Sequence, residues 1–130
     1  MFISLAKSSC LGLCYSWITG RNRLRSEHMA NVILGWRKSF IDDDGTVCLP
    51  VKYLSLINGG QWKVEIKNLP RKALADLPDE KDYVVFYSID GKNGHFVVAN
   101  KRGIVFNPLD YSNNVIKGKP INYRYIRQVG

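Results

Sequence analysis

The first sixty residues carry apolar side chains at helical spacing. An apolar segment spans residues 10–18, follows two serines that can cap a helix, and stops at Gly20. A second helix is predicted where apolar positions recur three and four residues apart, from Met29 to Phe40, with Ser26 as its cap. After a polar turn, Pro50 fits the first turn of a third, short helix. Three helices are therefore expected in this half.

Beyond residue 60 the hydrophobic period changes from 3.6 to 2. Trp62, Val64 and Ile66 alternate with charged residues, the pattern of a half-buried strand. We expect one or two helical turns within residues 70–77, followed by strands at 83–88, 95–99, 104–107 and 121–126. Helices first and mostly antiparallel strands afterwards predict one α+β domain over residues 1–130.

Composition narrows the class of protein. Hydrophobic residues make up 45% of the 130 residues and charged residues 23%, which excludes a disordered chain, a coiled coil and collagen. Three cysteines are an odd number, which argues against a secreted disulfide scaffold. No apolar stretch reaches membrane-spanning length, so we predict no transmembrane segment. The formal net charge of +8 favours anionic partners, although the same charge also serves solubility.

One cysteine and one histidine fall where a nucleophilic site needs them. Cys10 is predicted at a helix N-terminus, where the helix dipole lowers a thiol pKa and favours the reactive thiolate. Such a nucleophile needs a base, which a third polar group orients. His28 stands among charged residues and is interpreted as a solvated surface group. His95 begins an apolar strand, so its ring either serves a site or is held by a structural hydrogen bond.

The geometry of a β-hairpin suggests the third group. A three-residue turn would pair Asn100 with Ile104, and Asn107 would then be the diagonal neighbour of His95 on the same face of the sheet. A four-residue turn would bring Asp110 to that face instead. Asn107 is thus the first candidate and Asp110 the second. The alternative for the cysteine is a core role, since cysteine is among the most buried residue types.

Two motifs resemble a known superfamily. The run from Cys10 through Trp17, CLGLCYSW, resembles the nucleophile helix of papain-like cysteine peptidases, nearest the YopT/AvrPphB-type effector peptidases. The segment GHFVV around His95, followed by IVFNP, resembles their histidine strand and the next strand, as also found in bacteriocin-processing (peptidase-39-like) domains. The likeness covers both ends of the chain and the middle only in outline. It implies a papain-like fold, with the nucleophile helix packed on a C-terminal antiparallel sheet.

The sequence departs from this superfamily at two points. Asn107 stands where the nearest relatives have aspartate before proline, although an amide also suffices to orient a histidine. No glutamine precedes Cys10 to donate to the oxyanion, so the substitute would be Ser4, Ser8 or Ser9, or the backbone N–H of Cys10 together with another group.

The resemblance implies a cysteine hydrolase with no metal and no cofactor. Cys10 would attack an amide carbonyl, His95 would move the proton, and Asn107 or Asp110 would orient the imidazole. The expected role is that of a bacterial effector or toxin with a protein substrate in a target cell. The chain would be cytoplasmic or enter that cell without a cleaved signal peptide, and its oligomeric state stays open.

Two alternatives remain. A peptidoglycan amidase on the same scaffold would suit the charge of +8, because the substrate is an anionic polymer. A catalytically inactive basic protein would bind nucleic acid or a protein partner through residues 123–127, where arginines are interpreted as lining one face of a strand and aromatic residues the other. An edge strand with a charged outer face explains this pattern more simply, so nucleic acid is not expected.

Overall fold

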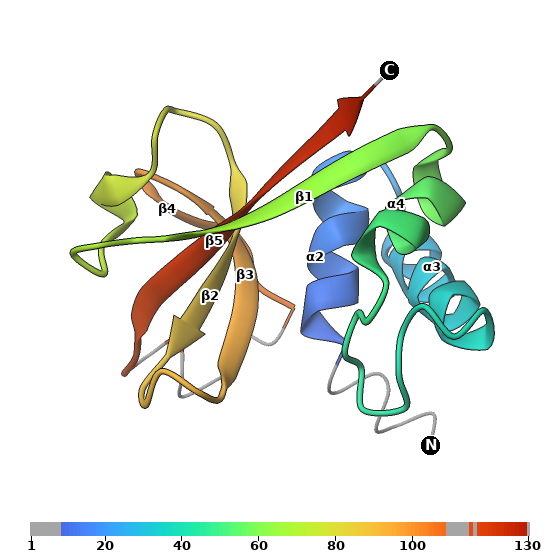
Figure 1. Ribbon diagram of the computed structural model, residues 1–130, viewed down its shortest axis with the longest axis horizontal. Coiled ribbons are helices and arrows are strands. Elements are labelled where there is room, and N and C mark those ends of the chain that lie inside the picture. The colour runs from blue at the N-terminus through green and yellow to red at the C-terminus, as the bar shows by residue number, and fades with distance from the viewer. Residues whose placement is uncertain (1–8, 109–114, 116, 130) are drawn as a thin grey trace.

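Three helices lie on one side of a five-stranded antiparallel sheet in the computed structural model, which describes residues 9–108, 115 and 117–129 (Figure 1). The predicted α+β class is confirmed. The helices are α2 (Cys10–Thr19), α3 (Arg25–Arg37) and α4 (Pro50–Asn58). None of the described helices is long and apolar enough to cross a membrane.

The ends of α3 differ from the prediction. Leu24, rather than Ser26, precedes the helix, and its N–H donates to the Glu27 carboxylate over 2.9 Å. At the other end, Phe40 lies beyond the helix. Ser39 adopts a φ of 63°, which turns the chain out of the helix, and the N–H of Phe40 reaches back to the carbonyl of Gly35.

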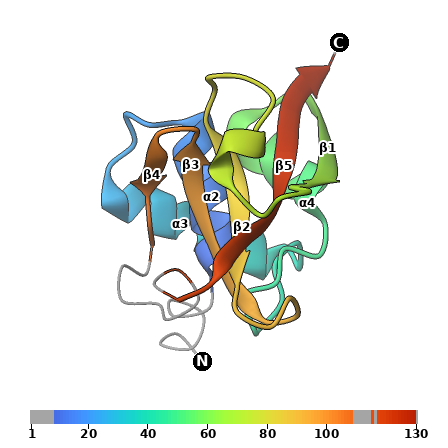
Figure 2. The ribbon, with the colours of Figure 1, turned by 90° about the vertical axis from the view of Figure 1, so that its left-hand side faces the viewer.

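The sheet has the strand order β1-β5-β2-β3-β4 (Figure 2). Its strands are β1 (Gln61–Asn68), β2 (Tyr83–Ser88), β3 (Gly94–Asn100), β4 (Gly103–Phe106) and β5 (Lys119–Val129), and a short 3-10 helix, η1 (Leu74–Asp76), lies between β1 and β2 in the chain.

The last strand corrects two interpretations of the sequence. β5 pairs with both β1 and β2, so it is a central strand and not an edge strand. Arg124 and Arg127 are three positions apart, and strand alternation therefore puts them on opposite faces of the sheet. The idea of one arginine face and one aromatic face is wrong.

The β3–β4 hairpin reaches the expected register by another route. Asn100 pairs with Gly103 and Ala99 with Ile104, so the turn has two residues and the expected Asn100–Ile104 pair is wrong. A bulge then shifts the register by one residue, so that Val98 pairs with Phe106. This shift restores the alignment that brings Asn107 to the level of His95.

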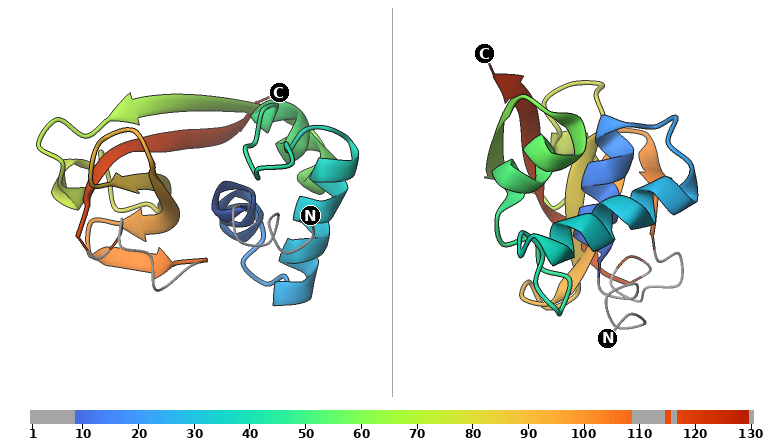
Figure 3. Two further views of the ribbon diagram at one scale, coloured as in Figure 1. Left: turned by 90° about the horizontal axis from the view of Figure 1, so that it is seen from below. Right: turned by 90° about the vertical axis from the view of Figure 1, so that its right-hand side faces the viewer.

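Helix α2 lies between the sheet and α3, and it is seen end-on in the left view of Figure 3. Strand β3 sends Phe96 and Val98 toward this helix. Val97 and Ala99 belong to a second apolar cluster on the opposite face of the sheet. The strand is thus buried on both faces, which explains its continuous apolar sequence.

Candidate active site

Cys10 is the first residue of α2, and its side chain is half-buried. Burial raises the pKa of its thiol, and this outweighs the N–H group of Phe96, the nearest backbone donors of the helix and the charge of Arg124, which lower it. The lowered pKa that the helix N-terminus predicts is therefore not obtained, because this end of α2 packs against the sheet. The contribution of the Phe96 N–H shows that the sulfur lies beside the backbone of β3.

His95 and Asn107 are joined by a hydrogen bond. His95 Nε2 lies 2.8 Å from Asn107 Oδ1, which confirms the contact expected from hairpin geometry. An amide oxygen accepts only, so Nε2 carries the proton and Nδ1 is the basic nitrogen of the neutral ring. His95 is only 3% exposed. Burial lowers the pKa of His95, and the hydrogen bond to Asn107 opposes this effect.

The cysteine and the histidine are neighbours without a direct bond. The sulfur of Cys10 lies next to the N–H of Phe96, the residue that follows His95. Strand alternation directs the His95 ring to the face of Val97, away from α2. Within the described residues, no hydrogen bond joins the Cys10 thiol to this ring. Asp110, the second candidate for the third group, lies outside the described residues.

Arg124 is a member of this region that the sequence did not reveal. Its guanidinium carbon lies 4.5 Å from the centre of the Phe96 ring, and its charge lowers the pKa of both Cys10 and Cys14. Its Nη1 is buried and has no hydrogen-bond partner among the residues that the structure describes. An arginine in an alternating strand is usually interpreted as a surface residue, and only the packing of α2 against this face of the sheet reveals its position.

His28 is buried, which corrects its interpretation as a solvated group. Its side chain is in contact with Ser16, whose Oγ lies 2.6 Å from His28 Nδ1. The amide of Asn31 donates to the same Oγ over 3.0 Å. Burial and the charge of Arg23 lower the pKa of His28. Ser16 is fully buried, so this cluster offers no accessible nucleophile.

Of the three serines considered as oxyanion donors, only Ser9 lies within the described residues. Ser9 is fully buried directly before α2, where its carbonyl accepts the N–H of Leu13 over 2.9 Å. Ser4 and Ser8 lie outside the described residues. No group of three potential metal ligands occurs in the described part of the chain.

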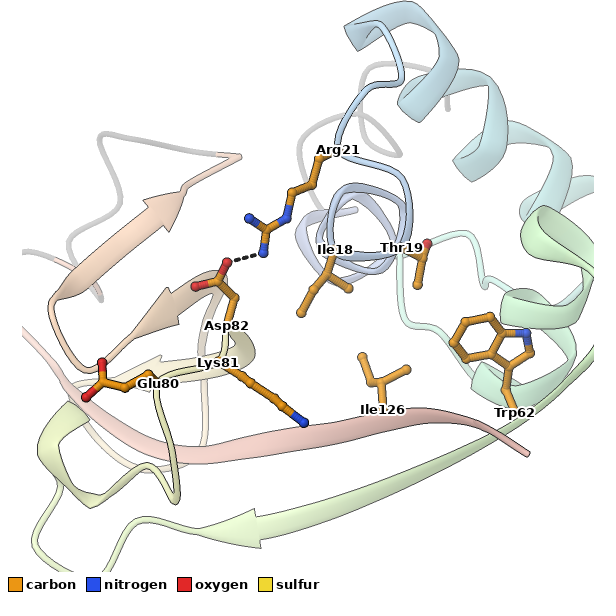
Figure 4. A pocket seen from close by; sticks show the side chains of 8 residues that line it. All are labelled: Ile18, Thr19, Arg21, Trp62, Glu80, Lys81, Asp82 and Ile126. Atoms are coloured by element: carbon orange, nitrogen blue, oxygen red, sulfur yellow. Dashed lines mark hydrogen bonds and ion pairs between the residues drawn. The ribbon is translucent and has the colours of Figure 1, made fainter. Parts of the chain in front are cut away.

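A pocket at the far end of α2 lies apart from Cys10. Ile18, Thr19 and Ile126 line it, and Arg21 forms an ion pair with Asp82 across its wall (Figure 4). Cys10 starts the helix that Thr19 ends, so this pocket is not part of the candidate site.

Comparisons with known proteins identify no relative of this chain. No protein-family model matches the chain, and the searches of curated proteins and of solved structures found no significant match.

Proposed function

We propose that this chain is a papain-like cysteine hydrolase that cleaves an amide bond in a protein substrate. The observation that carries the proposal is the hydrogen bond between His95 Nε2 and Asn107 Oδ1, at 2.8 Å. It holds the ring in the tautomer whose Nδ1 can accept a proton. The half-buried Cys10 begins a helix beside the same strand, which supports its role as the nucleophile.

The proposed reaction proceeds through a thioester. His95 Nδ1 takes the thiol proton of Cys10, and the sulfur attacks the carbonyl carbon of the substrate. The imidazolium then returns this proton to the leaving amine as the C–N bond breaks. Water, deprotonated by His95, hydrolyses the thioester and restores the thiol. This step requires the sulfur and the ring to come within hydrogen-bond reach, so the His95 side chain must turn from the face of Val97 toward the start of α2.

Arg124 has a supporting role in this scheme. Its charge favours the thiolate of Cys10 against the burial that opposes it. We further propose a bacterial effector or toxin as the biological setting, with its substrate inside a target cell. This setting, and the peptidoglycan amidase as its alternative, rest on the two sequence motifs.

The rate of alkylation by iodoacetamide tests the proposed pair. The rate at each cysteine is followed against pH by peptide mass spectrometry, with buried Cys14 and exposed Cys48 as internal controls. We expect Cys10 to react faster than Cys48 below about pH 8, and His95→Ala and Asn107→Ala to slow Cys10 alone. A Cys10 rate that does not change in folded His95→Ala would exclude the proposed pair.

A second candidate function is a catalytically inactive binding protein. The raised pKa of Cys10, together with the absence of a Cys10–His95 bond in the described residues, favours it. In that case Cys10 reacts only as the protein unfolds. Any binding of an anionic polymer by a chain of charge +8 should then weaken steeply with salt, and Cys10→Ala should leave it unchanged.

A further inference from the structure

Besides the cavity of about 480 Å³ at the end of α2, the protein has a second cavity of about 460 Å³. This second cavity lies on the side of α2 that faces α3 and the end of β4. The second cavity is the more apolar in its walls. Leu13 and Trp17 of α2, Met29 of α3 and Phe106 of β4 line it. Its volume falls in the range that small organic ligands occupy.

Two stacked aromatic rings form one wall of this cavity. The Trp17 and Phe106 rings are nearly parallel, at 8°, with their centres 5.2 Å apart. Trp17 is held from a helix and Phe106 from a strand, so neither ring depends on a loop for its position. Such a wall favours a planar apolar ligand, which packs against aromatic surfaces.

The charged part of the lining is cationic. Arg21, Arg23 and Arg25 all border the cavity, and no carboxylate lines it among the described residues. Arg21 is neutralised by Asp82, as Figure 4 shows, and lies over the Trp17 ring at 4.7 Å.

The charges of the other two arginines are not neutralised in this way. Arg23 donates only to neutral oxygens, among them the carbonyls of Ser16 and Ile57. Neither Arg23 nor Arg25 forms an ion pair within the part of the chain that the structure describes. The cavity therefore has an excess of positive charge over an apolar wall.

His28 adds a neutral donor to the same lining. Its Nδ1 contacts the hydroxyl of Ser16, and the amide of Asn31 already donates to that oxygen. The Ser16 hydroxyl can still donate its own hydrogen to Nδ1, and in that tautomer the proton of the neutral ring is on Nε2. An oxygen acceptor in the cavity would suit this nitrogen.

We propose that this cavity binds a small aromatic carboxylate, with its ring against Trp17 and Phe106 and its carboxylate toward Arg25 and His28. This proposal does not depend on the hydrolase activity, because binding is measured without any reaction. The cavity borders the candidate active site, because Asn107, the hydrogen-bond partner of His95, also lines it.

A matched pair of ligands tests it. 2-Naphthoate and 2-naphthamide share one ring system and differ in charge, and each is titrated into the ¹⁵N-labelled protein. The chain has three tryptophans, so three indole N–H signals report on location. Those of Trp36 and Trp62 donate to Asp43 and to the Gly59 carbonyl. We expect only the Trp17 signal, assigned with Trp17→Phe, to shift strongly.

The expected affinities follow from the lining. Naphthoate should bind about fivefold or more tightly than the amide, since only the carboxylate gains charge-assisted hydrogen bonds. Arg25→Gln should remove most of that difference and leave amide binding unchanged. Arg127→Gln, which removes the same charge from an exposed position on β5, should change neither affinity.

Three results would overturn the proposal. The first is equal affinity for the two ligands in the unaltered protein. The second is a comparable shift of all three indole signals, which would mean unspecific adsorption. The third is an Arg25→Gln protein, folded by its NMR spectrum, that retains the full preference for the carboxylate.

Discussion

The Nε2 atom of His95 lies 2.8 Å from the Oδ1 atom of Asn107, across the end of the β3–β4 hairpin. Because the amide oxygen has no proton to give, this contact assigns the proton of the neutral ring to Nε2. The ring is buried, so its charge state depends on this contact and on the polarity around Nδ1. Changes at residue 107 should therefore be read out at the histidine.

Asn107→Asp should raise the pKa of His95, because a carboxylate next to Nε2 stabilises the charged ring. Asn107→Ala should leave the pKa lowered and cost about 1–3 kcal/mol of stability, since the buried N–H loses this acceptor. Titration of the ring Cε1–H signal by NMR gives the pKa, and urea denaturation gives the stability. An unshifted pKa in folded Asn107→Asp would mean that the two side chains are apart in solution.

Stability should fall as the pH drops below the pKa of about 6.5 that histidine has in the unfolded chain. The pKa values of His28 and His95 are both lowered by burial from 6.5, so the unfolded chain binds more protons than the native one below that pH. Their contribution to stability is thus complete above the unfolded pKa and is lost as the pH falls from there through the lowered pKa values of the folded state. The shifted aspartates have pKa values below 3.8 and titrate outside this window.

Urea denaturation midpoints at several pH values measure this loss. His95→Gln should flatten the dependence in part, and the double variant with His28→Gln should flatten it almost fully. If the denaturation midpoint of the folded double variant still falls steeply with decreasing pH, other titratable groups cause the loss of stability.

The candidate dyad was predictable from the sequence because it depends on strand alternation and hairpin pairing. The predicted length of the turn was wrong. The correct alignment of His95 with Asn107 arises from a bulge in the hairpin, which the residue pattern does not predict. The bulge compensates for the shorter turn by one residue. The local prediction thus gave the right contact through a register that differs at the turn.

Contacts between segments far apart in the sequence could not be predicted from the sequence. His28 is buried because α2 presents Ser16 to it and β4 presents Phe106, and neither contact is visible in the sequence around His28. β5 is central because β1 pairs with its outer side. The pKa of Cys10 rises because the sheet covers the start of α2, an effect of packing that outweighs the helix terminus.

Arg23→Lys should cost about 1–3 kcal/mol of stability. The guanidinium donates to the Ser16 carbonyl over 2.9 Å and to the Asn58 side chain over 2.7 Å, so it ties α2 to the end of α4. An ammonium group cannot make both contacts in one plane. Arg25→Lys is the matched control and should be neutral in urea denaturation. Equal midpoints for the two variants would contradict this bridging role.

Cys14→Ser should destabilise the protein by about 1–3 kcal/mol, whereas Cys10→Ser should change its stability little. Cys14 has no exposed surface, so serine would bury a hydroxyl within the apolar cluster under α2. Cys10 is half-buried beside backbone donors that a hydroxyl can also use. Thermal melts of both variants compare the two sites. A large loss in Cys10→Ser would favour the core interpretation of this residue over the nucleophile.

Gly94→Ala should prevent folding or cost about 3 kcal/mol or more, because a Cβ there has no space. It would lie 2.6 Å from Cε1 of the Phe86 ring and closer still to the carbonyl oxygen of Tyr87, a backbone atom that cannot move aside. Gly91→Ala is the control, since that position has a φ of 82° but open space around it. Its cost should be about 1–2 kcal/mol, from backbone conformation alone. Urea denaturation of both variants measures the difference, and equal losses would mean that β2 and β3 are not in the register that pairs Ser88 with Gly94.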